Sequence, residues 1–485
     1  MSKTKPSTES AFLNRLSAAF LCAILVAPLL WAGARPRYGG TVRVVLQHKV
    51  TSLVPTEESE FPTQQARLSS LIFETLTQVD MQGHVRPCLA NSWQPESGGR
   101  VWQFQLRTAN FHSGAPLTSA AVAASLRAAS PDWKVSTNGR QSVIVETPAP
   151  APHLPEMLAL LRFVIVKKMA DGTLEGTGPF KLSEWRPGDH ALLTANDDYW
   201  GGRAYPDAMD VRMGLSLREH LLEHRLDPDH AAELGIDQVR TLEQSNQNLL
   251  LSRPADLLAV VFLQRNPPMA SGRKPVDPRI REAISMAMSR SAISNVLLQK
   301  KSAPARGLLP QWLTGYEFLL PVESNVDNAR KLRAEVSSTA PITLTYDFSD
   351  PVAKLVAERI AVDAREAGIF IQPFGDPHTN TVSERKTLNV DAVLLRLPLQ
   401  SLDAATALAG LEAELELSPE INAAILSANR PEDLLEAERK ALEDHRIIPV
   451  VHVSQSLWLN NNVHNWQILP NGAWKLDQLW VEGTR

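Results

Sequence analysis

Cysteine is scarce in this chain. Its 485 residues include only 2 cysteines, and one of them, Cys22, lies in an apolar stretch near the start of the sequence. If that stretch is removed, Cys88 has no partner with which to form an internal disulfide. We therefore expect an unpaired thiol at Cys88 and a fold that depends on its hydrophobic core.

Charge of one sign and recognisable catalytic motifs are lacking as well. The chain has 49 Lys and Arg against 53 Asp and Glu, a net charge of −4. This balance favours neither nucleic acid nor an anionic membrane surface as a partner. The sequence contains no nucleophile elbow, P-loop or C-x-x-C motif, and Gly176-Thr177-Gly178 lacks the third glycine of a dinucleotide fingerprint. We expect a protein that is not an enzyme and that has no cofactor.

A long apolar run occurs only near the start of the chain. A basic segment precedes Leu16–Trp31, and Ala32-Gly33-Ala34 follows with the small residues of a cleavage site. The pattern predicts a signal peptide over residues 1–34, cleaved after Ala34, and hence an exported protein. An uncleaved anchor is the alternative, although the run is short for a membrane span.

The first half of the remaining chain is typical of hairpin-rich structure. Thr41–Gln47 and Val101–Arg107 alternate apolar and polar residues, as in half-buried strands. The segments on either side of Pro187-Gly188-Asp189 alternate in the same way and predict a hairpin. Thr118 is placed to cap a helix that ends near Ala129.

The residue pattern changes near Leu258. Leu258–Leu263 is continuously apolar, as expected of a strand buried on both faces. Ile342–Tyr346, a helix that begins at Asp350-Pro351, and Ile369–Pro373 predict a β-α-β unit with a right-handed crossover. Since the chain is also too long for one core, we predict an α/β protein with at least two domains.

Eight short stretches occur in an order that is characteristic of one family. They are Gly39–Val44, Ser52–Pro55, Ile72–Leu76, Leu89–Trp93, Phe111–Thr118, Gly176–Phe180 with Trp185, Asn196–Trp200 and Arg265–Pro268. In this order, the chain resembles the peptide/nickel-type extracellular solute-binding proteins of ABC transporters, family 5. The resemblance extends from Tyr38 to about Trp480.

The resemblance implies a two-lobed, periplasmic-binding-protein-like α/β fold with a cleft between the lobes and an extra N-terminal subdomain. Lobe I would comprise residues 35–257, with residues 454–485 returning to it, and lobe II residues 258–453. The protein would be a periplasmic monomer that binds a peptide or another small polar solute and delivers it to membrane permease subunits. A non-transporting sensor or chaperone is the related alternative.

Solute contacts are expected where strands end, because ligands of α/β sheets gather beyond the carboxyl ends of the strands. Three groups follow predicted strands. The residues are Gln47, Thr51 and Ser52; Gln264 and Asn266; and Arg396, Gln400 and Asp403.

The third group departs from the family pattern. Peptide-binding members carry an aspartate that pairs with the peptide's amino terminus, in a stretch similar to residues 391–405, but the tryptophan and the first aspartate of that stretch are missing here. Arg396 instead offers donors suited to a carboxylate. We therefore expect a free amino terminus to contribute little to binding.

A histidine cluster supplies the alternative from another class. On a helix, His220 and His224 would share a face, with His230 nearby. Leu221 stands where a zinc-protease motif needs glutamate, and the segment is dense in charge, so a solvated surface helix without metal is the preferred interpretation. An exported metal-dependent hydrolase is the alternative, and a metal assay would distinguish the two.

Overall fold

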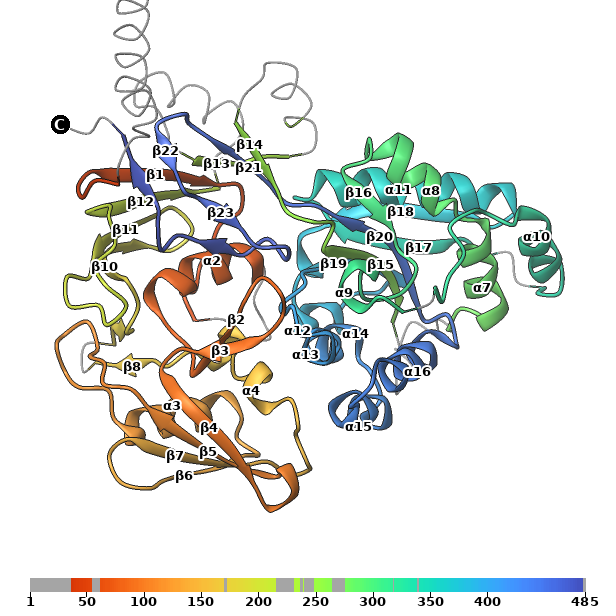
Figure 1. Ribbon diagram of the computed structural model, residues 1–485. Helices are drawn as coiled ribbons and strands as arrows, with labels where there is room; N and C mark the ends of the chain where they lie inside the picture. Colours follow the sequence, from red (N-terminus) through yellow and green to blue (C-terminus); the bar gives the residue numbers. More distant parts are fainter. Residues whose placement is uncertain are drawn as a thin grey trace, which may run out of the picture.

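The fold is known from a computed structural model that describes residues 36–54, 62–169, 172–214, 231–235, 239, 248–263, 275–316, 318–337 and 340–482. The segment predicted as a signal peptide lies outside these ranges. Two sheets organise the molecule, and each forms the centre of one lobe (Figure 1). No helix within these ranges is long and apolar enough to cross a membrane.

Lobe I is organised by a seven-stranded mixed sheet. Its strands, in spatial order, are β10 (Phe180–Arg186), β11 (His190–Ala195), β12 (Ala208–Met213), β1 (Thr41–Leu46), β13 (Ala231–Glu233), β21 (Ser456–Leu459) and β14 (Leu249–Leu251). The predicted alternation holds in the first part of β1, where Val42 and Val44 are buried, but not at its end, where Val45 is buried as well. The predicted hairpin is confirmed as β10–β11. Helix α2 (Pro62–Ile72) packs against the same core.

A four-stranded antiparallel sheet forms the N-terminal subdomain. Its order is β4 (Ala90–Glu96), β5 (Val101–Leu106), β7 (Ser142–Glu146) and β6 (Lys134–Thr137). Trp102, Phe104 and Leu106 of β5 point to the core, as the alternation predicts. Helix α3 (Ser119–Ala129) covers this core, and its predicted cap is confirmed, since Thr118 accepts a hydrogen bond from the Ala121 amide.

Smaller elements complete the subdomain and lead to the lobe I sheet. They are β2 (Thr77–Val79), β3 (Val85–Pro87), α4 (Leu154–Met157), β8 (Lys167–Lys168) and β9 (Leu174–Glu175). The glycines of the Gly176-Thr177-Gly178 stretch allow this segment to lie directly against the end of α2. A Cβ at Gly176 would be 1.9 Å from the Ile72 carbonyl oxygen, and one at Gly178 would be 2.7 Å from it.

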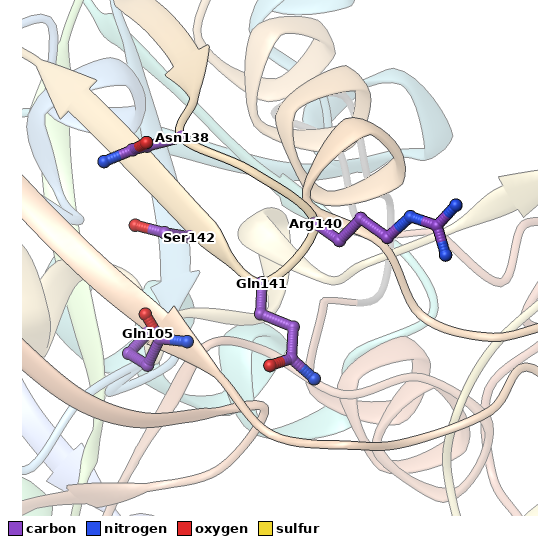
Figure 2. A pocket seen from close by; sticks show the side chains of 5 residues that line it. All are labelled: Gln105, Asn138, Arg140, Gln141 and Ser142. Carbon is purple, nitrogen blue, oxygen red and sulfur yellow. The ribbon is translucent and has the colours of Figure 1, made fainter.

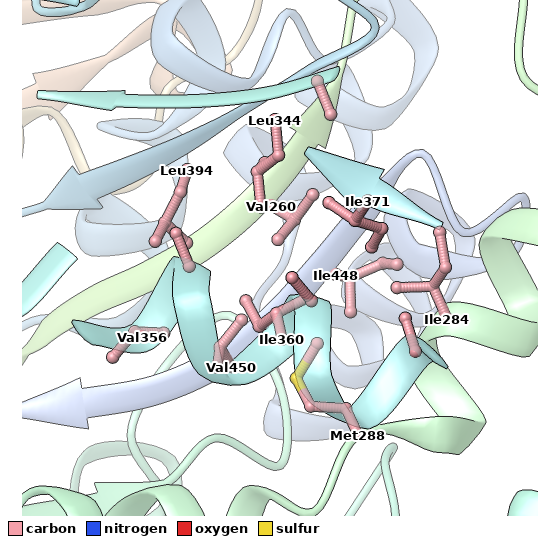
Figure 3. Packing of buried hydrophobic residues seen from close by; sticks show 14 of the residues in the cluster. Val260, Ile284, Met288, Leu344, Val356, Ile360, Ile371, Leu394, Ile448 and Val450 are labelled. Carbon is pink, nitrogen blue, oxygen red and sulfur yellow. The ribbon is translucent and has the colours of Figure 1, made fainter. Parts of the chain in front are cut away.

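Lobe II contains a six-stranded sheet with helices on both faces. The order is β16 (Ser302–Pro304), β20 (Ile447–Val453), β15 (Asp256–Phe262), β19 (Ala392–Leu397), β17 (Ile342–Asp347) and β18 (Ile371–Asp376). On one face pack α7 (Pro278–Ala287), α10 (Val326–Ala334) and α11 (Pro351–Glu366), as Figure 3 shows for α11 and α7. The other face is covered mainly by α13 (Ala404–Ala409), α15 (Pro419–Ser427) and α16 (Pro431–Leu442).

The β-α-β prediction is confirmed. Strands β17 and β18 pair in parallel, and α11 connects them after a cap at Asp350. The sheet is nevertheless mixed, because β15 pairs antiparallel with both β19 and β20. All seven residues of β15 and of β20 are buried, which explains why their sequences are apolar apart from Asp256 and His452.

Two short segments join the lobes. One links β14 to β15 and the other links β20 to β21, so the chain enters lobe II and leaves it at neighbouring positions (Figure 1). The segments are hydrogen-bonded to each other, from Ala255 N to Val453 O at 3.0 Å and from Ser252 N to Gln455 O at 3.0 Å. The predicted lobe boundaries fall two residues inside β15 and at the end of β20.

Candidate functional site

A polar pair lies where the two connecting segments run side by side. The Gln455 Nε2 donates to Asp256 Oδ1 at 2.9 Å. Asp256 begins β15, and Gln455 directly precedes β21, so each residue belongs to one connection. Burial raises the pKa of Asp256, although the positive charge of Arg396 opposes this effect. The junction between the lobes is therefore a specific, buried polar contact.

An arginine reaches this pair from lobe I. Arg67 of α2 is buried, donates to the side chain of Gln455 and the carbonyl oxygen of Gly472, and forms an ion pair with Glu233. Burial lowers the pKa of Arg67 to about 10, so the guanidinium stays charged at neutral pH. Glu233 also accepts a hydrogen bond from the Gln47 amide at 2.9 Å. Arg67 thus connects the junction to the loop that follows β1.

A second arginine reaches the pair from lobe II. Arg396 of β19 donates to Asp350 through Nε at 2.7 Å and through Nη2 at 3.0 Å, while its Nη1 lies 3.9 Å from Asp256 Oδ2. About 32% of the Arg396 side-chain surface is open to solvent, against 9% for Asp350. At 3.9 Å, Nη1 is too far from Asp256 for a hydrogen bond, so that carboxylate does not use its hydrogens.

Asp350 has two functions in this arrangement. Its Oδ1 accepts from the Val352 and Ala353 amides at 2.9 and 3.1 Å, which caps α11, while both oxygens also accept from Arg396. Burial acts to raise the pKa of Asp350, but the charge and hydrogen bonds of Arg396 and the two amides outweigh it, and the pKa lies below its usual value. The carboxylate is therefore ionised and holds Arg396 in place.

The loop after β1 faces these lobe II residues. Burial lowers the pKa of His48, and the positive charge of Arg396 lowers it further, while Asp350 and Asp347 oppose the shift. A half-buried imidazole of lobe I thus lies within the electrostatic reach of three charged residues of lobe II. Gln65 of α2 fixes the next part of this loop by donating to the carbonyl oxygens of Ser52 and Val54, both at 2.9 Å.

Three of the residues predicted to contact the solute, Gln47, Thr51 and Ser52, belong to this loop. Gln47 is anchored through its amide to Glu233, and Thr51 and Ser52 are exposed. The structure therefore brings Gln47 and Arg396 to the two sides of one polar network. Gln264 and Asn266 lie outside the described residues, as do His220, His224 and His230.

The other two predicted contacts follow β19. Gln400 is exposed. Asp403 caps α13 by accepting from the Thr406 amide at 2.9 Å, and its Oδ2 lies 3.8 Å from His153 Nδ1 of the subdomain. The side chain of Asp403 is therefore already engaged on both sides, by its own helix and by an imidazole.

Sequence reasoning missed His48, Asp256 and Arg67. Asp350 was noted only as the start of a helix, and its second function needed the register of β19 beside β17. The one available signal was a charged residue, Asp256, at the start of an otherwise apolar run, which argues for a partner at that position.

Outside the junction, a buried acid holds lobe I and the subdomain together. Glu74 accepts hydrogen bonds from Thr177 Oγ1 at 2.7 Å, Tyr199 Oη at 2.8 Å and Trp200 Nε1 at 2.9 Å. Burial raises the pKa of Glu74, which these hydrogen bonds partly oppose. Cys88 is unpaired and buried, its Sγ lies 3.7 Å from Glu74 Oε1, and burial raises the pKa of its thiol well above the usual value, which disfavours the nucleophilic thiolate.

A cavity of about 450 Å³ lies apart from the junction. Figure 2 shows its lining, which comprises Gln105, Asn138, Arg140, Gln141 and Ser142. All five residues come from the subdomain, so lobe II contributes no wall to it. Among the described residues, no group of three or more His, Cys, Asp or Glu side chains could hold a metal ion.

The fold and the junction define a class of protein. Two α/β lobes, joined by two adjacent segments and lined at their junction by polar side chains, form the architecture of two-lobed binding proteins. The family model for bacterial extracellular solute-binding proteins, family 5 Middle, matches residues 84–414. The chain belongs to this family, whose members are extracellular or periplasmic solute receptors.

One relative of known class agrees with this assignment. The probable D,D-dipeptide-binding periplasmic protein DdpA of Escherichia coli (strain K12) is 25% identical over 289 residues, which covers 54% of this chain and 55% of that protein. The chain is therefore aligned with only about half the length of that relative.

Solved structures share the fold over nearly the whole chain. NikA from Staphylococcus aureus, in complex with Ni(L-His)2, has a TM-score of 0.76 at 18% identity and covers 91% of this chain and 100% of its own. DppA from Helicobacter pylori, in complex with the peptide STSA, has a TM-score of 0.78 at 16% identity and covers 92% of this chain and 99% of its own. The two structures confirm the two-lobed α/β fold.

Proposed function

We propose that the protein is an exported receptor of an ABC importer, which binds a peptide or another small polar solute between lobe I (residues 35–257 and 454–485) and lobe II (residues 258–453). The solute would be delivered to permease subunits in the membrane. The mature protein would be a periplasmic monomer that begins near Arg35 and has no enzymatic activity. N-terminal sequencing of the exported protein tests the processing, and retention of residues 1–34 would contradict it.

The arrangement of Arg396 carries this proposal. Its Nε and Nη2 are held by Asp350, so the orientation of the guanidinium is set before any solute arrives. Its Nη1 and the exposed third of its side chain remain for a solute carboxylate or carbonyl. Gln47, Thr51, Ser52, Gln264, Asn266, Gln400 and Asp403 are the proposed further contacts.

The names of known members support a small polar solute without selecting one. The relatives named above bind a D,D-dipeptide, a nickel–histidine complex and a tetrapeptide by their printed names. A carboxylate or peptide carbonyl is common to these ligands, and Arg396 is suited to both.

Native mass spectrometry of the purified protein tests the proposal. We expect a co-purified small molecule that Arg396→Gln loses, because glutamine keeps a donor but not the charge. Gln94→Leu, at an exposed position of the subdomain, is the control and should keep the ligand. If no peptide, chelate or other small solute binds in this assay or in a thermal-shift screen of such compounds, the receptor function is wrong.

A further inference from the structure

The subdomain touches lobe II at a second place, away from the connecting segments. Strands β2 and β3 and helix α4 of the subdomain lie beside the start of α13 of lobe II (Figure 1). The connecting segments lie at the other side of the interlobe region. Contacts at both sides would fix the angle between the lobes.

The hairpin tip that makes this contact is held by its own hydrogen bonds. Asp80 Oδ1 accepts from the Gln82 and His84 amides at 3.0 and 2.9 Å, and its Oδ2 accepts from Arg86 Nε at 2.8 Å. The Gly83 amide donates to the Asp80 carbonyl oxygen at 3.0 Å. The tip between β2 and β3 is therefore a defined turn, in which Gly83 has a φ of +85°.

Gly83 lies directly against the backbone of lobe II. A Cβ at Gly83 would be 2.6 Å from the Leu402 carbonyl oxygen and 3.4 Å from its carbonyl carbon. Contacts under 3.0 Å do not occur for a real Cβ, so only glycine permits this approach. Val79, at the end of β2, also packs against the apolar cluster that includes Leu402.

An imidazole makes the second contact. His153, which precedes α4, donates from Nε2 to the Ala428 carbonyl oxygen at 2.8 Å, since a carbonyl oxygen can only accept. Its Nδ1 lies 3.8 Å from Asp403 Oδ2. A cavity of about 220 Å³ lies next to these contacts, and His153 is its one subdomain residue.

We propose that Gly83, Val79 and His153 form a latch that holds the subdomain against lobe II before any solute is bound. We call the arrangement in which the subdomain lies against lobe II closed. Every contact in the latch is made between protein atoms, so the closed arrangement is stabilised without a ligand. A solute then enters during brief openings and is selected by its fit to a closed cleft. This goes beyond the receptor function, because it concerns the protein without solute.

A distance measurement between two spin labels tests the latch. Lys134 of β6 and Arg439 of α16 are suitable label positions, with side chains 80% and 58% exposed. In the mature chain the buried thiol of Cys88 does not compete for the label. For the solute-free protein, we expect one narrow distribution at a short distance, and the addition of a solute should not shorten it.

The variant Gly83→Ala should open the latch. Gly83→Ala places a Cβ against Leu402, and we expect the ratio of open to closed protein to rise at least tenfold, which corresponds to about 1.4 kcal/mol. Gly114→Ala is the matched control, because Gly114 has a φ of +83° in the same subdomain but no atom within 4 Å of its Cβ position. The control carries the same backbone strain and should stay closed.

His153→Ala is an independent test that leaves the hairpin intact, and it should also raise the open fraction. The latch is refuted if solute-free protein shows a broad or long-distance distribution, or if Gly83→Ala and His153→Ala both match Gly114→Ala. The measurement needs no ligand. A failure of the receptor function would therefore appear in the mass spectra and leave these distances unchanged.

Discussion

Gln455 and Asp256 are hydrogen-bonded to each other across the two segments that connect the lobes, and an arginine from each lobe reaches this pair. The buried carboxyl group of Asp256 is therefore hydrogen-bonded by the neutral side-chain amide of Gln455, which also accepts a hydrogen bond from Arg67. Such shared partners make the contribution of one residue larger than that of a single hydrogen bond.

Gln455→Leu should destabilise the protein by about 3 kcal/mol, because it removes a hydrogen-bonding partner from both Asp256 and Arg67, which are buried. Urea unfolding measures the change. Gln94→Leu replaces an exposed glutamine and should shift the free energy of unfolding by less than about 0.5 kcal/mol. Equal effects of the two substitutions would mean that the Gln455–Asp256 pair contributes nothing to the free energy of unfolding.

Arg396→Met should cost about 3–5 kcal/mol of stability, because it leaves the buried Asp350 charged and without a cation. Asp350→Asn keeps a capping side chain for α11 but removes the charge. We expect the double variant to be less destabilised than the sum of the two single variants by more than about 1 kcal/mol. Simple additivity in urea unfolding would contradict the coupling.

The Arg396–Asp350 pair should also respond to acid. The pKa of Asp350 is below its usual value, so the folded protein binds this proton less readily than the unfolded chain. Its contribution to stability is therefore complete above about pH 4 and is lost as the pH falls through the folded pKa. Relative to Asp350→Asn, the wild-type protein should lose stability between neutral pH and this acid range.

Glu74 should show the opposite pH dependence. Because burial raises its pKa, the folded protein holds this proton more tightly than the unfolded chain. The contribution of Glu74 is present below about pH 4.3 and is lost as the pH rises through the folded pKa. The wild-type protein should therefore lose stability relative to Glu74→Gln as the pH rises above about 4.3.

Asp403 should not act as an anchor for an amino terminus, because its carboxylate caps α13 and faces His153. A bound peptide and its N-acetylated form should differ less than about tenfold in affinity, or 1.4 kcal/mol, by calorimetry. Asp403→Asn keeps the cap and should change the affinity little. A hundredfold loss on acetylation that Asp403→Asn reproduces would show that this assignment is wrong.

The sequence predicted most elements because their signals are local. The alternation in β5, the caps at Thr118 and Asp350 and the β-α-β unit at Ile342–Asp376 depend only on neighbouring residues, and all are present. The antiparallel pairing of β15 with β19 and β20 was not predictable, because it joins segments more than 100 residues apart.

The candidate site shows the same division. Strand ends pointed to Gln47 and Arg396, which the structure brings to the two sides of one network. The partners of these residues, Glu233 and Asp350, come from other strands and helices, and no spacing along the chain relates them. Such pairs can be predicted only when the pairing register of the strands is known, and a single sequence does not specify the register of distant strands.

Lobe II begins and ends at points that are far apart along the chain but adjacent in space, since the Ala255 amide nitrogen donates to the Val453 carbonyl oxygen at 3.0 Å. A segment whose two ends meet behaves as an insertion within another domain, because it can be replaced without moving the flanking strands of that domain. Lobe II is therefore a natural unit for exchange between relatives. A chimaera joined at β14 and β21 would keep the lobe I sheet while changing one whole wall of the cleft.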